Sequence, residues 1–154
     1  MFRSLRTLLV ALPLALGACS SSTTAPTIEE ATFAPALGVN LATSTRLATG
    51  VYYRDVTVGT GATVANSQSL SVRYSGFLTN GSSFDANPAP APLFTFTLGA
   101  REVISGWDQG IIGMRVGGVR QLIIPPAFGY GNNAVGGIPA NSILVFTVEV
   151  IAAS

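Results

Sequence analysis

The middle of the chain reads Phe94-Thr95-Phe96-Thr97-Leu98-Gly99 and, two residues later, Glu102-Val103-Ile104-Ser105-Gly106-Trp107. In the first run apolar side chains alternate with threonines, which is the period-two pattern of a strand with one buried face. Within residues 105–114, Trp107 and Ile111 lie four positions apart, the spacing of one face of a helix. These runs therefore predict a strand and then a short helix, which a glycine pair ends soon afterwards.

Four further strand patterns surround this centre, at residues 51–58, 69–78, 119–124 and 143–151. In the last of them every second residue from Leu144 to Val150 is apolar, so these side chains share one face. Asn80-Gly81 follows the pattern at 69–78 and predicts a two-residue hairpin turn, because both residues tolerate a left-handed backbone. Several strands and one helix predict an α+β domain with the sheet curled over the helix.

The composition favours a packed core and restricts the chemistry. Of 154 residues, 48% are hydrophobic and 10% charged, which is typical of a globular chain rather than a disordered one. The net charge is +1, and without Arg3 and Arg6 six arginines face seven acids, so no basic patch indicates a nucleic-acid partner. The chain has no histidine and one cysteine. It lacks the commonest general base and metal ligand, and we expect neither a metal nor a cofactor.

The N-terminus has the pattern of a targeting signal. Arg3 and Arg6 precede an apolar run from Leu8 to Leu16, which is too short to span a bilayer at ~20 residues and is typical of a signal peptide. The run ends in Leu16-Gly17-Ala18-Cys19, which resembles the bacterial lipobox, where the signal is cut before a lipidated cysteine. We therefore expect residues 1–18 to be a lipoprotein signal peptide and Cys19 to carry lipid. The alternative is a small buried cysteine beside a generic signal.

The residues after Cys19 change character before the regular patterns begin. Residues 20–27 consist mainly of serine and threonine and form a polar linker with little capacity for a core. Residues 28–49 contain scattered apolar side chains and could form a short helix or a segment that folds back on the domain. The expected division is residues 1–18, 19–49 and 50–154, the last being the folded domain.

Further motifs flank the central runs in the order of a known family. They are Val72-Arg73-Tyr74-Ser75-Gly76, Asn80-Gly81-Ser82-Ser83-Phe84-Asp85, Met114-Arg115-Val116-Gly117-Gly118, Pro125-Pro126-Ala127-Phe128-Gly129-Tyr130-Gly131, Ile138-Pro139 and Leu144-Val145-Phe146. With the central runs included, residues 50–152 resemble the FKBP-type peptidyl-prolyl cis-trans isomerases. The resemblance implies a curled antiparallel sheet of five to six strands wrapped around one short helix. It also implies an apolar cleft between sheet and helix that binds a prolyl peptide.

The resemblance assigns two groups of residues to this cleft. Those that act on the prolyl bond would be Asp85, Tyr130, Ile104 and Tyr74. Those that bind the substrate would be Phe84, Phe94, Val103, Trp107, Ile138 and Phe146, with Trp107 as the floor. Each has a plainer interpretation. Phe94, Phe146 and Trp107 could be ordinary core residues, and Asp85 and Tyr130 could be solvated loop residues.

Isomerisation of a prolyl bond breaks no covalent bond, so it needs no nucleophile. The barrier of ~18–20 kcal/mol comes from amide resonance, and an apolar, water-free pocket favours the less dipolar twisted imide. The resemblance implies that the Ile104 N–H and the Tyr130 hydroxyl hold the imide carbonyl. Asp85 would either orient Tyr74 or interact with the rotating carbonyl, and both roles stay open.

One departure from the family pattern lies beside Asp85. The family often places an arginine shortly after this aspartate, whereas here the stretch Asn87–Pro92 contains no cation. Arg73 or another arginine could replace it. An enzyme is therefore one interpretation, and a binding or chaperone module of the same fold with weak turnover is another. A purely structural envelope lipoprotein is the third, although it would not need the whole pocket.

The expected partners follow from the signal and the resemblance. They are proline-containing unfolded or nascent secreted proteins, macrolide inhibitors, and a membrane reached through the lipid on Cys19. Ser20 rather than aspartate follows the cysteine, which in lipoprotein sorting implies the outer membrane, facing the periplasm.

Overall fold

The computed structural model describes residues 25–154, so the predicted signal peptide and Cys19 lie outside the described residues. The strands are β1 (Thr45–Arg46), β2 (Tyr52–Thr57), β3 (Ser69–Leu78), β4 (Ser83–Asn87), β5 (Phe94–Thr97), β6 (Val119–Ile124) and β7 (Leu144–Ala153). The helical elements are α1 (Ser105–Gly110) and three short 3₁₀ turns, η1 (Pro35–Leu37), η2 (Leu41–Thr43) and η3 (Pro126–Phe128). Within residues 25–154 no helix has the length and apolar character needed to cross a membrane.

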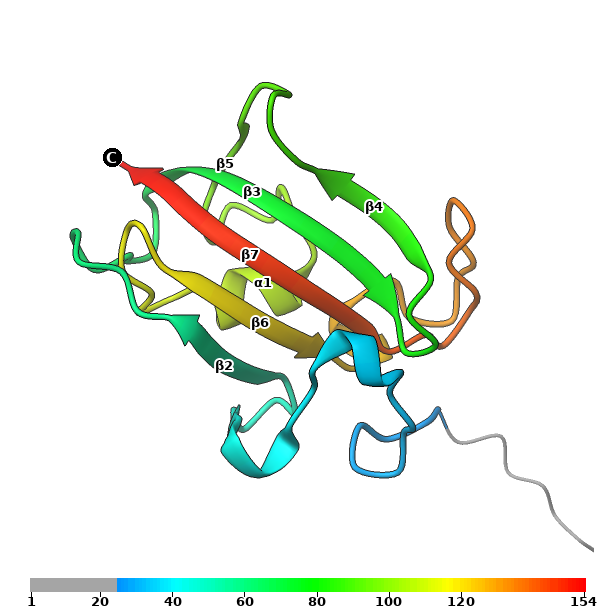
Figure 1. The fold of residues 1–154 in the computed structure, drawn as a ribbon. Helices are drawn as coiled ribbons and strands as arrows, with labels where there is room; N and C mark the ends of the chain where they lie inside the picture. The colour runs from blue at the N-terminus through cyan, green and yellow to red at the C-terminus, as the bar shows by residue number, and fades with distance from the viewer. Residues whose placement is uncertain (1–24) are drawn as a thin grey trace, which may run out of the picture.

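The strands form one antiparallel sheet in the order β1-β2-β6-β7-β3-β4, and α1 lies against one of its faces (Figure 1). β4 and β5 pair with successive parts of the same edge of β3, with Asp85 opposite Gly76 and Phe94 opposite Val72. The predicted α+β fold is confirmed. The sheet has seven strands rather than five or six, because the two-residue β1 and the short β4 are separate members.

The inner face of the sheet and α1 enclose the main core. The predicted alternation is confirmed in β7, where Leu144, Val148 and Val150 are fully buried. Glycines let the helix approach the sheet: a Cβ at Gly106 would lie 2.5 Å from Ile124. α1 ends at Gly110 rather than continuing to residue 114 as predicted. The reason is local, since Gly113 has a φ of +80° that no α-helix accommodates.

The hairpin predicted at Asn80-Gly81 joins β3 to β4, but its turn type was predicted wrongly. Gly81 N donates to Leu78 O at 2.9 Å and Leu78 N donates to Ser82 O at 2.9 Å, which makes a three-residue loop with a bulge. Gly81 has a φ of +89°, whereas Asn80 has no positive φ. The Asn80 side chain instead accepts a hydrogen bond from Ser82 N at 2.9 Å.

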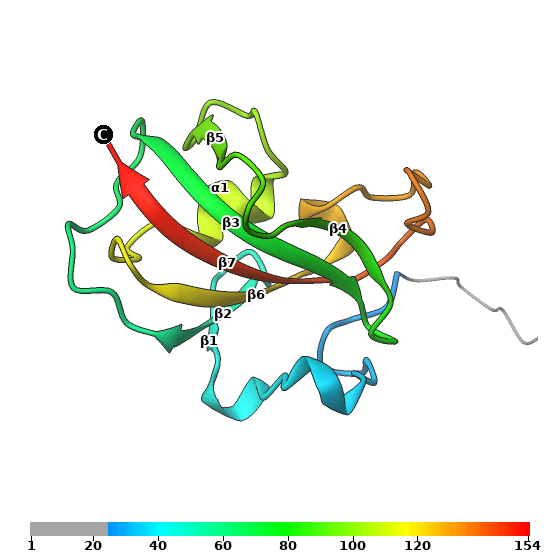
Figure 2. The same cartoon turned by 45° about the horizontal axis from the view of Figure 1, so that its top comes forward.

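The outer face of the sheet is covered by an N-terminal cover, defined here as residues 26–43. Figures 1 and 2 show this segment on the side of the sheet opposite α1. Its Ile28 is 2% exposed and packs in a cluster with Tyr52, Ile123 and Val145. Of the two open interpretations of residues 28–49, the structure agrees with the segment that folds back on the domain, and the helical parts of the segment are two three-residue 3₁₀ turns.

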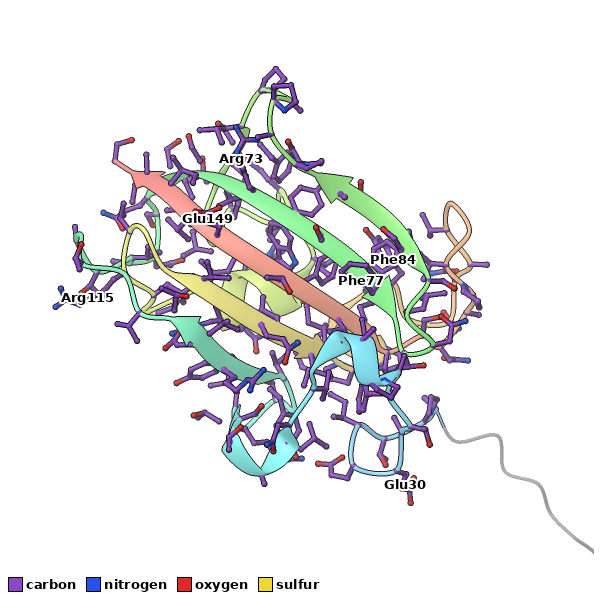
Figure 3. The ribbon with its side chains drawn as sticks, viewed as in Figure 1. Glu30, Arg73, Phe77, Phe84, Arg115 and Glu149 are labelled. Carbon is purple, nitrogen blue, oxygen red and sulfur yellow. The ribbon has the colours of Figure 1, made fainter. Side chains whose placement is uncertain are left out.

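Polar contacts fix the cover in place. Gln121 Nε2 donates to Leu37 O at 2.7 Å, and Arg54 Nη2 donates to Gly38 O at 2.9 Å. The cover stops where the outer face becomes polar, at residues such as Arg73 and Glu149, which Figure 3 shows on the open part of this face. The folded unit described here thus begins before residue 50.

Candidate functional site

An open cleft of about 360 Å³ lies on the α1 side of the sheet. A cleft of this size fits a short peptide or drug-sized ligand. β3, β4, β5, β7, α1 and two loops contribute to its walls. Its lining residues are Tyr74, Asp85, Phe94, Arg101, Glu102, Val103, Ile104, Trp107, Tyr130 and Phe146.

Trp107 forms the floor of the cleft and is 4% exposed. Its ring meets those of Tyr74 and Phe146 edge-on, with centroids 5.2 and 5.3 Å apart. Phe94 approaches it in the same way at 6.3 Å. Edge-to-face contacts of this kind add about 0.5–1.5 kcal/mol each to the burial of the rings. The floor is therefore a fixed, apolar surface.

The rim contains a hydrogen-bonded pair. The Tyr74 hydroxyl donates to Asp85 Oδ2 at 2.8 Å. Burial, together with this bond and the charge of Asp85, raises the pKa of Tyr74 to about 12. Burial, and secondarily the charge of Asp85, also raises the pKa of Tyr130. Both tyrosines are consequently protonated at neutral pH and can act as hydrogen-bond donors.

No cation pairs with Asp85 within residues 25–154, where the ion pairs are Arg46–Glu29 and Arg120–Asp55. Arg73 does not replace the missing arginine, because its Nη1 donates to Ala91 O at 3.1 Å. Tyr74 is thus the partner of Asp85, which agrees with the orienting role considered from the sequence.

Several donors at the cleft have no acceptor in the described part of the chain, among them the buried Trp107 Nε1, the Ile104 N–H and the Tyr130 hydroxyl. Ile104 precedes α1 in an extended conformation, and its carbonyl accepts from Trp107 N at 2.9 Å. Its own N–H makes no hydrogen bond there, and neither does the Tyr130 hydroxyl. The cleft can therefore offer a main-chain and a side-chain donor to one carbonyl oxygen.

The structure brings eight of the ten predicted site residues into this lining: Tyr74, Asp85, Phe94, Val103, Ile104, Trp107, Tyr130 and Phe146. The other two lie behind it. Phe84 packs edge-on against Phe146 at 5.4 Å, and Ile138 is 5% exposed in the main core cluster. The sequence-based assignment missed Arg101 and Glu102, which also line the cleft. Their position directly before Val103, a predicted cleft residue, could have indicated that they lie at the same cleft.

Comparison with known proteins agrees with this geometry. A family model described as FKBP-type peptidyl-prolyl cis-trans isomerase matches residues 61–151. The chain belongs to this family. The predicted resemblance is confirmed as far as the FKBP domain is concerned, and residues 61–151 of the FKBP match include every cleft residue named above.

Relatives of known sequence cover the same FKBP domain. FK506-binding protein 4 of Chaetomium thermophilum is 50% identical over 117 residues, which is 76% of this chain and 23% of that protein. A peptidyl-prolyl cis-trans isomerase of Saccharomyces cerevisiae is 46% identical over 66% of this chain and 25% of that protein. The chain thus spans about a quarter of the length of these curated relatives.

Solved structures share the fold. The crystal structure of AtFKBP13 matches with a TM-score of 0.68 and 35% identity, covering 72% of this chain and 98% of that one. FkpA from Escherichia coli matches with a TM-score of 0.67 and 36% identity, over 73% of this chain and 52% of that one.

Proposed function

We propose that this FKBP domain catalyses the cis–trans isomerisation of Xaa-Pro bonds in peptides and unfolded proteins. The observation that carries the proposal is the rigid aromatic cleft above Trp107 with two uncommitted donors at its edge. The family match and the name of the yeast relative support isomerase activity. Family members bind proline-containing chains and macrolides, and we expect both kinds of ligand to occupy this cleft.

The geometry accounts for catalysis by solvent exclusion and orientation. The proline ring would rest on Trp107, where the apolar walls remove water from the imide and favour its twisted, less dipolar form. The Ile104 N–H and Tyr130 hydroxyl would hold the carbonyl oxygen. An uncatalysed prolyl bond isomerises in tens to hundreds of seconds. An acceleration of ~10⁴–10⁵ requires about 5–7 kcal/mol of preferential transition-state stabilisation, within reach of desolvation and two hydrogen bonds.

Asp85→Ala should lower kcat/KM by about tenfold, equivalent to ~1–2 kcal/mol. The substitution removes the acceptor of the Tyr74 hydroxyl and the negative charge that raises the pKa of Tyr130, so Tyr74 loses its hydrogen-bond partner and the electrostatic environment of Tyr130 changes. The measurement is cis-to-trans relaxation of a Leu-Pro peptide. Glu30→Ala is the matched control, because Glu30 is exposed on the N-terminal cover (Figure 3). Equal kcat/KM for Asp85→Ala and wild type would exclude a role for this pair.

A binding or chaperone module with weak turnover is the second candidate. The observation that favours it is Asp85, which has no cationic partner in the described chain. In this case peptides would bind the cleft with ordinary affinity while their relaxation stayed close to the rate in solvent.

We also propose that the protein acts outside the cytoplasm as a lipoprotein, anchored to the outer membrane and facing the periplasm. The support is Leu16-Gly17-Ala18-Cys19, the apolar run before it and the serine after it. Its clients would then be unfolded or nascent secreted proteins. Several acyl chains, each CH₂ contributing about 0.8 kcal/mol, would anchor the protein stably.

Cys19→Ser should abolish lipid attachment and leave the protein unprocessed or soluble. Isomerase activity should persist, because the residues that line the cleft all come from positions 74–146 of the sequence. Mass spectrometry of the mature N-terminus is the measurement. A wild-type protein that begins at another residue and carries no lipid mass would disprove the anchor.

A further inference from the structure

Arg101 stands out among the residues that line the cleft. It is exposed at the mouth, two positions before Val103. Its φ is +62°, in the left-handed region where a residue with a Cβ is strained and glycine or asparagine is favoured. Strained residues of this kind cluster at active sites and ligand-binding segments, although Ser67 and Asn141 also have a positive φ. The long side chain is thus presented to the cleft at a conformational cost.

The charged groups around the mouth differ in what they already bind. Asp85 accepts from the Tyr74 hydroxyl at 2.8 Å. Glu102 Oε2 accepts from Thr97 N at 2.9 Å. Among the charged side chains that line the cleft, Arg101 is the one that forms no hydrogen bond or ion pair within residues 25–154.

We propose that Arg101 determines substrate specificity by favouring peptides with an acidic residue directly before or after the proline. The inference rests on the proposed function, since it concerns the same cleft. A guanidinium offers a carboxylate two parallel N–H donors. Because the pair is exposed to water, its effect is modest, about two- to fivefold in affinity, and it weakens with salt.

The test uses two peptide series with Glu, Gln or Lys immediately before or immediately after the proline. Binding is followed through the fluorescence of Trp107, the single tryptophan of the chain, and turnover is measured on the same peptides. At low salt the Glu peptide of at least one series should bind about two- to fivefold more tightly than its Lys counterpart. This preference should disappear near 1 M salt, where the screening length falls to about 3 Å.

Three variants separate charge from structure. Arg101→Gln should remove the preference and Arg101→Glu should invert it. Arg115→Gln, which alters an exposed arginine at the far end of the sheet (Figure 3), should keep it. Arg101→Gly should also remove it while raising the melting temperature, because glycine relieves the left-handed backbone.

The two proposals fail separately. Equal affinity for Glu and Lys peptides in both series, or a preference that Arg101→Gln leaves intact, overturns the role of Arg101 even if turnover is normal. A preference that depends on Arg101 without turnover supports this inference for a binding cleft and overturns the isomerase.

Discussion

Arg120→Met should lower the free energy of unfolding by about 3–5 kcal/mol, with the lower end expected because Asp55 is partly solvated. Arg120 is 3% exposed and bonds Asp55 through Nε at 2.7 Å and Nη2 at 3.0 Å. Its Nη1 donates to Gly110 O at 2.8 Å and Ile112 O at 3.1 Å, and its guanidinium lies 4.2 Å from the centre of the Tyr53 ring. Methionine fills the volume but leaves these acceptors without a donor.

The loss of these bonds should also affect the cleft. Gly110 and Ile112, whose carbonyls Arg120 binds, lie at the end of the segment that begins with α1 and contains Trp107. Urea denaturation measures the loss. Arg115→Met is the matched control, since Arg115 is exposed and, within residues 25–154, its side chain bonds only to Gly61 O, so a change within about 0.5 kcal/mol is expected. Asp55→Leu combined with Arg120→Met should recover part of the stability, because no buried charge is then left alone. A wild-type-like midpoint for Arg120→Met would contradict this role.

Ile28→Ala should cost about 2–4 kcal/mol of stability. Ile28 is 2% exposed, although it lies near the start of the described chain and far in sequence from Ile123 and Val145, with which it packs. This loss of stability cannot exceed the free energy with which the N-terminal cover binds the sheet. If the cavity left by Ile28→Ala costs more than that, the cover detaches instead. Urea denaturation measures the loss of global stability, and hydrogen exchange of the residues around Ile28 measures the detachment of the N-terminal cover.

The matched control is Ile112→Ala, whose side chain is 47% exposed, so its removal should change stability by less than about 0.5 kcal/mol. Deleting the N-terminal cover should additionally expose Ile123 and Val145, which are each 1% exposed in the intact chain, and promote association through the apolar patch. If Ile28→Ala were as harmless as Ile112→Ala, the cover would not be part of the folded unit.

Periodicity predicted the long strands well because their inner faces are regular. β3 and β6 have the predicted bounds, 69–78 and 119–124. β4 was missed, since Ser83–Asn87 is largely exposed and contains an aspartate and an asparagine, which are depleted in strands. It becomes a strand through its pairing with β3, a tertiary contact that no local pattern reveals.

The sequence also contains an indication that the outer face of the sheet is covered. Leu122-Ile123-Ile124 and Leu144-Val145-Phe146 are continuous apolar runs, which indicate strands buried on both faces. Alternation also places Arg120 on the inner face with Leu122 and Ile124, yet its partners come from β2 and the end of α1. Position along a strand was predictable, whereas the identity of the contacting segment was not.

The sequence predicts the site residues that belong to a motif. It predicts less well the contacts that depend on the conformation of a loop. Trp107, Tyr74 and Asp85 lie in motifs that resemble the family, and the structure gathers them at one cleft. Within residues 25–154, Asp85 bonds to the Tyr74 hydroxyl and not to a cation. The reason is that Arg73 donates to Ala91 O in the 88–93 loop, and the sequence does not predict the conformation of this loop. The contribution of Arg101 depends on a left-handed backbone that its sequence context does not indicate.

The most direct test of the central claim is cis-to-trans relaxation of a Leu-Pro or Phe-Pro peptide in the presence of the folded protein. The account predicts a relaxation rate that rises in proportion to protein concentration. It also predicts that Trp107→Leu, which keeps an apolar floor but removes the ring contacts to Tyr74 and Phe146, lowers the rate while the protein stays folded. A protein with native circular dichroism whose peptide relaxes no faster than in buffer would contradict it.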